Sequence, residues 1–176
     1  MKIKHILFTL FFLFIFSSCE TKKDDLRPNF VFILADDLGY GELGILGQKF
    51  IETPNIDQLA KEGMILKDHY SGSPVCAPAR AVLLTGLHSG NNPIRGNDEW
   101  RERGDVWSFQ AMFENSDLEG QRPMPDSIIT VAEFLQSNGY KTGMVGKWGL
   151  GAPNTNSIPN NKGFDFFYGY NCQRQA

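Results

Sequence analysis

An acidic pair is the first feature of this chain with a clear chemical use. Asp36 and Asp37 follow the apolar run 29–35, and the glycines Gly39 and Gly41 come directly after them. Adjacent carboxylates supply hard oxygen ligands for a divalent cation. Neighbouring side chains of an extended chain point to opposite faces, so both carboxylates reach one ion only if the chain turns there. The pair predicts a cation site, while a solvated turn is the alternative that an isolated Asp-Asp favours.

A cysteine and an arginine have a spacing that suits the binding of an anion. Cys76-Ala77-Pro78-Ala79-Arg80 is followed by an apolar run that ends at Thr85-Gly86, which predicts a helix beginning near Cys76. The N–H groups and the macrodipole at the start of a helix favour negative charge. Because Arg80 is four residues further on, it lies one helical turn away on the same side. The pattern predicts an anionic group at position 76 with Arg80 as its donor.

Alternating strands and helices must position these groups. The run 29–35 is almost entirely apolar, which is typical of a parallel strand buried on both faces. Open α/β sheets bind ligands at the carboxyl ends of such strands, where Asp36 and Asp37 lie. The sequence also predicts a helix from Pro54, capped by Thr53 and ended by Gly63, followed by a strand over 64–69. Further along the chain it predicts a helix that is capped by Asp126 and ends near Asn138, and then a strand over 140–145. The predicted fold class is α/β.

The segment 91–125 has weak periodicity and is longer than most connections in compact domains. Its aromatic and charged residues suit stacking on a sugar ring and hydrogen bonding to hydroxyls; they are Arg95, Asp98, Glu99, Trp100, Arg101, Arg103, Trp107 and Phe113. The alternative, favoured for any single residue, is that the aromatics fold the segment against the domain.

The N-terminus is predicted to be an export signal. Lys2 and Lys4 precede the apolar run 6–16, which is about half the ~20 residues that a membrane-spanning helix needs. Residues 16–19, Phe-Ser-Ser-Cys, resemble a bacterial lipobox, which predicts a lipoprotein signal peptide over 1–18, a lipid anchor on Cys19 and a polar tether over 19–27. We expect an exported protein of the bacterial envelope or periplasm. Simple secretion without lipidation is the alternative.

Charge and cysteine usage argue against a nucleic-acid-binding protein and against a disulfide-stabilised fold. The chain has a formal net charge of −3, and its part after Cys19 is more acidic because Lys2 and Lys4 precede that residue. No basic patch in the sequence supplies the phosphate contacts of a nucleic-acid-binding protein. The three cysteines, Cys19, Cys76 and Cys172, have separate expected fates, so a disulfide framework is not predicted.

Several motifs together resemble the N-terminal part of the formylglycine-dependent sulfatases over most of residues 28–170. The similar segments are Arg27-Pro28-Asn29, Asp36-Asp37-Leu38-Gly39, Thr53-Pro54-Asn55-Ile56-Asp57, the segment from Cys76 to Arg80, Leu83-Leu84-Thr85-Gly86, Gly146-Lys147-Trp148 and Gly163-Phe164-Asp165. The resemblance implies an alkaline-phosphatase-like fold with a mixed, largely parallel sheet flanked by helices. It assigns residues 28–176 to the N-terminal part of the catalytic domain and leaves the fold incomplete in this chain.

The resemblance also implies roles for individual residues. Cys76 would be oxidised to formylglycine by a maturing enzyme, and the hydrated aldehyde would attack the sulfur of a sulfate ester. Asp36, Asp37 and modified Cys76 would bind Ca²⁺, while Arg80 would support the diol and Lys147 would contact the sulfate.

One departure from the family pattern concerns Gly149. Many sulfatases have a histidine there, in Gly-Lys-Trp-His-Leu-Gly, and use it near the nucleophile or leaving group. We interpret the glycine as a subfamily character. His88 could compensate as a catalytic residue, although a histidine after a helix is more often a capping or packing residue. His69 is predicted to lie near the site with even odds of lining it.

Length limits what this chain can do alone. The family's members run well beyond 176 residues and take a second pair of metal ligands from later sequence. We therefore expect the chain by itself to be inactive and poorly stable.

The sequence as a whole predicts a sulfuric ester hydrolase that acts on a sulfated carbohydrate or an aryl sulfate. Two alternatives stay open. One is a phosphodiesterase or phosphonate-ester hydrolase of the same fold, because the diol and metal also suit a phosphoryl centre. The other is a non-catalytic glycan-binding surface lipoprotein.

Overall fold

The computed structural model of the protein describes residues 26–98, 108–115, 118 and 120–173. The chain divides into two compact units, Met1–Ile65 and Leu66–Ala176, and each is described by itself. The predicted signal peptide, Cys19 and residues 99–107 of the long connection lie outside the described residues. Within the described ranges, no helix has the length and apolar character needed to cross a membrane.

The apolar run 29–35 is extended but forms no strand ladder, so the predicted buried strand is wrong for the described chain. Val31 is 85% exposed and Ile33 84% exposed. The backbone N–H and C=O groups of a strand need a neighbouring strand as hydrogen-bond partner. The structure describes no strand in the first unit beside this run, so apolar composition alone does not bury it.

Short helices follow in the first unit: η2 at Tyr40–Glu42, η3 at Gly44–Leu46 and α2 at Pro54–Glu62. The predicted start and end of α2 are confirmed, with Thr53 as N-cap, Pro54 in the first turn and Gly63 as C-cap. Thr53 does not cap the helix with its side chain. Its hydroxyl instead accepts from the Gly44 amide at 2.9 Å and donates to Asp57 at 3.0 Å, which ties η3 to α2.

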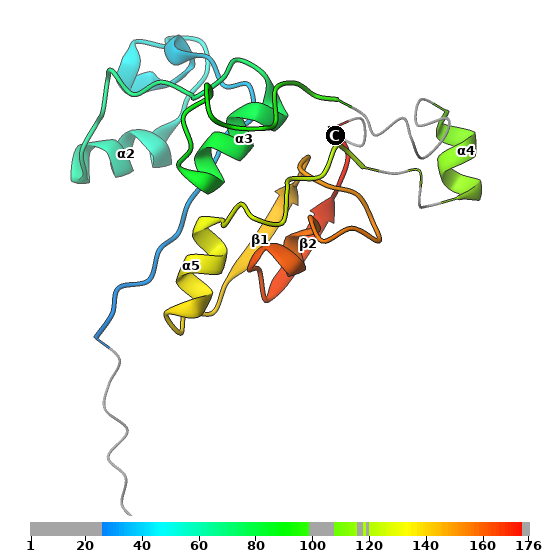
Figure 1. Ribbon diagram of the computed structural model, residues 1–176. Helices are drawn as coiled ribbons and strands as arrows, with labels where there is room; N and C mark the ends of the chain where they lie inside the picture. The colour runs from blue at the N-terminus through cyan, green and yellow to red at the C-terminus, as the bar shows by residue number, and fades with distance from the viewer. Residues whose placement is uncertain (1–25, 99–107, 116–117, 119, 174–176) are drawn as a thin grey trace, which may run out of the picture. The chain divides into compact units, whose positions relative to one another are not determined.

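The second unit is built around two parallel strands (Figure 1), β1 at Gly143–Lys147 and β2 at Phe166–Tyr170. Residue 143 pairs with 166 and residue 147 with 170. Its other elements are α3 at Cys76–Thr85, α4 at Phe109–Glu114, α5 at Val131–Ser137 and η6 at Pro159–Lys162. The strand predicted over 140–145 therefore lies slightly later, over 143–147. The strand predicted over 64–69 is absent: the described residues there are exposed and irregular.

The core of this unit lies between α3 and one face of the sheet. Ala77 and Ala81 of α3 pack in one cluster with Ile94, Met124, Trp148 and Leu150, and Met144 and Phe167 pack against it from the sheet. Met144 and Phe167 are register partners, so they share a face. Trp148 is fully buried, meets the ring of Phe164 edge-on at 6.1 Å and donates from Nε1 to the Ser157 carbonyl at 2.7 Å. This packing holds the end of β1 against the start of α3.

The helix α5 begins later than the sequence predicted. Its N-cap is Thr130, whose hydroxyl accepts from the Glu133 amide at 3.1 Å, while the Glu133 carboxylate accepts from the Thr130 amide at 2.8 Å. This capping box satisfies two backbone donors at once. Asp126 lies upstream of the helix, and its carboxylate accepts from Asn156 instead. The prediction of Asp126 as the cap was wrong because Thr130 has Glu at the position that a capping box requires.

Candidate functional site

The predicted helix start at Cys76 is confirmed. Cys76 is the first residue of α3 and is half-buried, and its predecessor Val75 is the N-cap with no side-chain acceptor to offer. Asn97, from the segment after the helix, supplies the missing acceptor: its Oδ1 accepts from the Ala77 amide at 2.8 Å. The first turn of α3 is thus tied to the segment 94–98, and Cys76 stands at the positive end of the helix dipole.

Arg80 and Lys147 meet at the end of β1. The Arg80 guanidinium donates from Nη1 to the Lys147 carbonyl at 2.6 Å. Lys147 is the last residue of β1 and is almost fully buried. The structure therefore joins the cysteine motif to the Gly-Lys-Trp motif 67 residues later along the chain. The guanidinium of Arg80 thus lies against the backbone at the end of β1.

Buried carboxamides connect the start of α3 to the segment after β2. The backbone N–H of Gln173 donates to Gln121 Oε1 at 2.9 Å, and Gln121 Nε2 donates to the backbone carbonyl of Asn97 at 3.4 Å. Gln121 is 1% exposed. Because Asn97 also accepts from Ala77, the network runs from the end of β2 to the first turn of α3. Sequence analysis did not identify these amides, since isolated Asn and Gln residues far apart in sequence carry no spacing signal.

Gly149 has a structural reason to be glycine. Its φ is +73°, in the left-handed region that disfavours residues with a Cβ. A Cβ there would also lie 1.8 Å from Nε2 of Gln173. Gln173 thus occupies the space that a side chain at position 149 would need. The glycine at the position of the family's histidine is matched by a carboxamide beside it, in keeping with our interpretation of a subfamily character.

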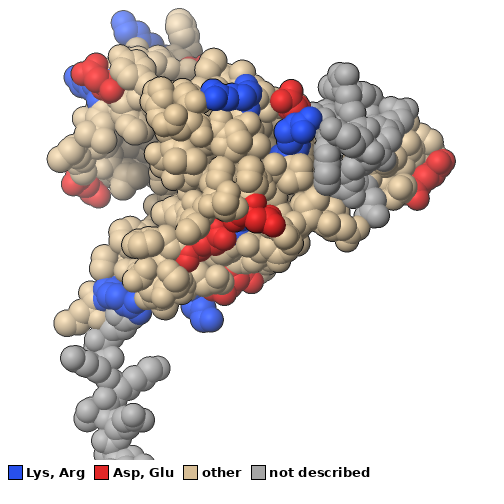
Figure 2. All heavy atoms as spheres, in the orientation of Figure 1, with Lys and Arg blue, Asp and Glu red and all other residues tan. Residues whose placement is uncertain are grey.

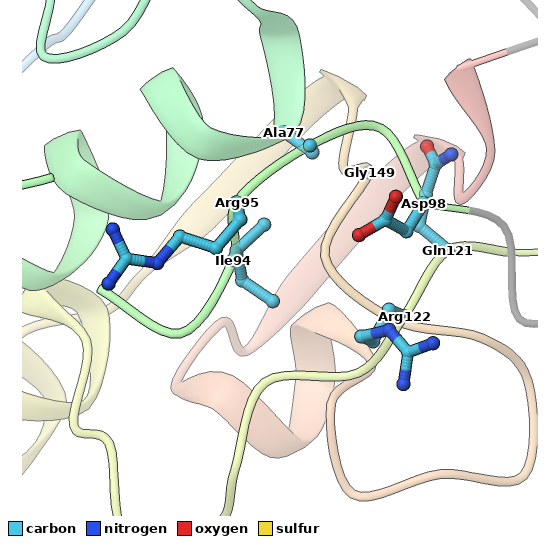
Figure 3. Close-up of a pocket in the computed structure, with 8 residues that line it drawn as sticks. Ala77, Ile94, Arg95, Asp98, Gln121, Arg122 and Gly149 are labelled. Carbon is cyan, nitrogen blue, oxygen red and sulfur yellow. The ribbon is translucent and has the colours of Figure 1, made fainter. Parts of the chain in front are cut away.

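A small pocket lies next to the start of α3 (Figure 3). Its lining includes Ala77, Ile94, Asp98, Gln121, Arg122 and Gly149. Arg95 also lines it, but its guanidinium donates to the Ser89 and Gly90 carbonyls at 2.6 and 2.8 Å. Figure 3 shows the side chains of Arg95 and Arg122 pointing in different directions, away from Gly149. The segment 94–98 and Gln121, which are tied by hydrogen bonds to the first turn of α3, also form walls of this pocket.

Asp36 and Asp37 belong to the first unit, where the chain turns as the metal hypothesis requires. Asp37 has φ of +56°, a left-handed conformation that Asp tolerates better than most residues. As a result, one carboxylate oxygen of each aspartate lies within 4.8 Å of the other. Both are exposed. This separation fits two ligands of one cation, and the participation of Cys76 in the same site stays a prediction.

His88 and His69 are both exposed in the structure. His88 is exposed, and its Nδ1 accepts from the Gly90 amide at 3.0 Å, a local contact in the turn after α3. The catalytic role of His88 stays a prediction. His69 is exposed and lies in no strand. Of the residues proposed to stack on sugars, those over 99–107 lie outside the described residues, and Phe113 is an exposed residue of α4.

Charged side chains lie at several places on one face of the protein. Figure 2 shows acidic side chains gathered near the middle of this face and basic side chains in separate places, on a mostly uncharged surface. The described Lys and Arg residues form no continuous patch on this face.

Comparison with known proteins identifies the family from which these motifs come. Residues 28–175 match the sulfatase family. The chain belongs to the sulfatase family. It is 39% identical to human arylsulfatase D over 166 residues, which cover 91% of this chain and 26% of that protein. The chain therefore spans about a quarter of the length of this relative.

Two solved structures share the fold of this sulfatase chain. The crystal structure of Ps i-CgsB, also solved in complex with k-i-k-neocarrahexaose, is 35% identical and superposes with a TM-score of 0.62 over 80% of this chain and 27% of its own. A protein from the study of glycosaminoglycan metabolism in Bacteroides thetaiotaomicron is 28% identical, with a TM-score of 0.66 over 83% of this chain and 28% of its own. The predicted alkaline-phosphatase-like α/β fold class is confirmed, and the described chain carries part of it.

Proposed function

We propose that the complete protein hydrolyses sulfate esters of carbohydrates through a formylglycine made from Cys76. The observation that carries the proposal is the position of Cys76 at the start of α3 with Arg80 bonded to the end of β1 at Lys147. Membership of the sulfatase family supports the reaction class. The similar structure in complex with k-i-k-neocarrahexaose and the similar protein from glycosaminoglycan metabolism support a carbohydrate substrate.

The proposed reaction has two steps, and residues of this chain assist each of them. Water adds to the formylglycine aldehyde to give a geminal diol, and one diol oxygen attacks the sulfur while the S–O bond to the alcohol breaks and the alcohol takes a proton. The second diol hydroxyl then loses its proton, the C=O bond forms again and sulfate leaves. Arg80 orients the diol, and Lys147 offsets the charge of the sulfate by a charge-assisted hydrogen bond. The N-terminal dipole of α3 favours the deprotonated oxygen.

Asp36 and Asp37 are the residues we propose as ligands of a divalent cation, with Ca²⁺ as the ion. Their carboxylate oxygens are hard donors and lie close enough together to share one ion. When bound, the ion would polarise the sulfate oxygens and lower the pKa of the attacking hydroxyl. The remaining ligands would come from modified Cys76 and from sequence outside this chain.

The decisive experiment expresses the complete protein with a sulfatase-maturing enzyme. Peptide mass spectrometry across Cys76 should show the aldehyde, and the protein should release sulfate from a nitrophenyl sulfate and from sulfated oligosaccharides. Hydrolysis of nitrophenyl phosphate in preference to the sulfate would favour the phosphoryl-transfer alternative. An unmodified thiol with retained glycan binding would favour the non-catalytic lipoprotein. Cys76→Ala should abolish turnover.

Export and lipid anchoring at Cys19 complete the proposal. They rest on the charged start, the apolar run 6–16 and the lipobox-like residues before Cys19. Labelling with a radioactive fatty acid should mark the wild-type protein and leave a Cys19→Ala variant unlabelled. Labelling of both proteins would exclude this anchor.

A further inference from the structure

A second, larger depression adjoins the pocket beside α3. We call it the Arg122 groove; it is formed by residues 93–94, 122–126 and 154–157 and has a volume of about 640 Å³. This is within the range of sites that bind small molecules. Its floor is buried, with Ile94 at 5%, Met124 at 2% and Ser157 at 1% exposure. Its rim is exposed and carries Pro93, Arg122, Pro125 and Asn154.

Hydrogen bonds fix the walls of the groove to each other. The Met124 amide donates to Ser157 Oγ at 3.0 Å, and the Asn156 side chain donates to the Asp126 carboxylate at 2.9 Å. Both bonds join the wall 122–126 to the wall 154–157. A groove with such connections is largely formed before a ligand arrives, which lowers the cost of binding.

The same walls are tied to the end of β1. The Met124 amide also donates to the Leu150 carbonyl at 3.3 Å, and Trp148 Nε1 donates to the Ser157 carbonyl at 2.7 Å. Trp148 follows Lys147 directly, and Leu150 comes two residues after Trp148. These hydrogen bonds therefore fix the position of the groove relative to the end of β1.

The lining suits a sugar ring. Prolines and the apolar floor offer surfaces for the C–H faces of a ring, and Asn154 and Arg122 offer polar groups for its substituents. Asn154 has φ of +61°, so the chain keeps a left-handed turn at the rim with a carboxamide on it. Arg122 adds a permanent cation that can bind a sulfate or carboxylate group in a two-pronged arrangement.

The Arg122 groove and the pocket beside α3 share part of their lining, so a ligand that extends from the start of α3 could also occupy the groove. Ile94 and Arg122 line both depressions, and the pocket is also lined by Ala77, the residue after Cys76 (Figure 3). A chain-like ligand with one unit at the start of α3 would thus place a neighbouring unit in the groove.

We propose that the Arg122 groove binds the sugar that neighbours the one carrying the scissile sulfate, and that Arg122 binds an anionic substituent of that neighbour. The inference rests on the proposed function and deepens it: the preferred substrate is an anionic oligosaccharide, and a single sulfated sugar leaves the groove empty. Binding energy from the groove therefore depends on the length of the substrate and on the charge of the second sugar.

The test compares Arg122→Ala with the wild type in the complete, matured protein. The substrates are a nitrophenyl sulfate and sulfated hexasaccharides from carrageenan and from glycosaminoglycans. Because the variant loses a hydrogen bond to a charged group, kcat/KM for the preferred hexasaccharide should fall about tenfold or more, through KM. The nitrophenyl sulfate should lose less than about threefold. Arg122→Lys should recover part of the loss.

Two further variants separate a binding role from a structural one. Asn154→Gly keeps the left-handed turn and removes the carboxamide, so it should weaken hexasaccharide binding more than it weakens binding of the nitrophenyl sulfate. Lys141→Ala is the matched charge control, since Lys141 is exposed and precedes the other end of β1. It should leave both substrates unaffected. An equal loss on both substrates for Arg122→Ala, or no loss on either, would overturn the proposal.

Calorimetric binding keeps the inference separate from the proposed chemistry. In a Cys76→Ala background, which has no nucleophile, the hexasaccharide should bind, and Arg122→Ala should weaken binding about tenfold. This result supports the groove even if the wild-type protein cleaves no sulfate ester, in which case the proposed function alone fails. Absence of binding to the Cys76→Ala protein, or equal binding with and without Arg122, would refute the groove.

Discussion

The first unit of the chain is stabilised mainly by hydrogen bonds, whereas the second unit is stabilised by a buried core. No described residue of the first unit is buried, and its order comes from hydrogen bonds such as those among Gly44, Thr53 and Asp57. The second unit has a core with Trp148, Leu150 and Ala81 fully buried. The difference teaches that apolar composition is not sufficient for a core: the run 29–35 is the most apolar described segment of the first unit, yet it is exposed. Packing needs a partner surface, and α3 provides one for the sheet of the second unit.

The largest expected effect tests the core of the second unit. In the complete protein, Trp148→Ala should cost about 3–5 kcal/mol of unfolding free energy, because a large buried ring and its hydrogen bond to Ser157 are lost. Phe50→Ala in the first unit, where the side chain is 95% exposed, should change stability by less than about 0.5 kcal/mol. Chemical denaturation measures both. A comparable cost for Phe50→Ala would show that the contrast between the units disappears in the complete protein.

A matched pair of glycines sharpens the comparison. Gly149 and Gly47 both have positive φ, at +73° and +106°, but a Cβ at Gly149 would meet Gln173, whereas a Cβ at Gly47 has nothing within 4 Å. Gly47→Ala should lower the unfolding free energy only by the backbone strain, about 1–2 kcal/mol. Gly149→Ala should lose about 0.5–1.5 kcal/mol more, because the overlapping atoms are the flexible end of the Gln173 side chain, which must leave its preferred rotamer.

Thermal and chemical unfolding of the two variants should therefore differ. Combining Gly149→Ala with Gln173→Gly should recover the extra loss and leave only the strain. If the double variant is no more stable than Gly149→Ala, the overlap with Gln173 is not the cause.

A smaller and local effect tests the hydrogen-bonded order of the first unit. Asp57 Oδ1 accepts from the Ile45 amide at 2.8 Å and from the Thr53 hydroxyl at 3.0 Å. Asp57→Ala should lower the local opening free energy around η3 by about 1–2 kcal/mol. Hydrogen exchange should show faster exchange of the Ile45 amide and unchanged protection of α3. Loss of protection in α3 as well would mean that the two units unfold together.

The smallest effect concerns Asp165 in the second unit. Its carboxylate accepts from the Thr142 amide at 3.0 Å and from Gln136 at 2.9 Å, and these bonds, the one to the backbone foremost, lower the pKa of Asp165. A lowered pKa means that the carboxylate stabilises the fold above the pKa of the unfolded chain, and that this contribution is lost as the pH falls through the folded pKa. The group is exposed, so the contribution is small.

The measurement is the melting temperature of Asp165→Asn against the wild type over a range of pH. The wild type should be slightly more stable at neutral pH, and the difference should vanish in acid. A difference that stays constant with pH would show that the charge of Asp165 has no part in it.

Local signals determined much of the helical structure. Pro54 with Gly63, and Cys76 with the apolar residues after it, predicted α2 and α3 because caps and helix periodicity act over a few residues. Where two local signals competed, the stronger chemistry prevailed: the capping box of Thr130 and Glu133 placed the start of α5, and Asp126 bonds to Asn156 instead. The strand β2 was not predicted, since its partner β1 lies some twenty residues earlier and parallel pairing is not a local property.

By itself the sequence determined the family and predicted the residues that we propose for its chemistry. Asp36, Asp37, Cys76, Arg80 and Lys147 stand in motifs whose spacing is local, and a motif is readable without a fold. Only the tertiary structure decided how Arg80 meets the end of β1, that the backbone is left-handed at Gly149 with the side chain of Gln173 beside it, and which walls form the Arg122 groove. Those features depend on contacts between segments distant in sequence, and such contacts exist only once the chain has packed.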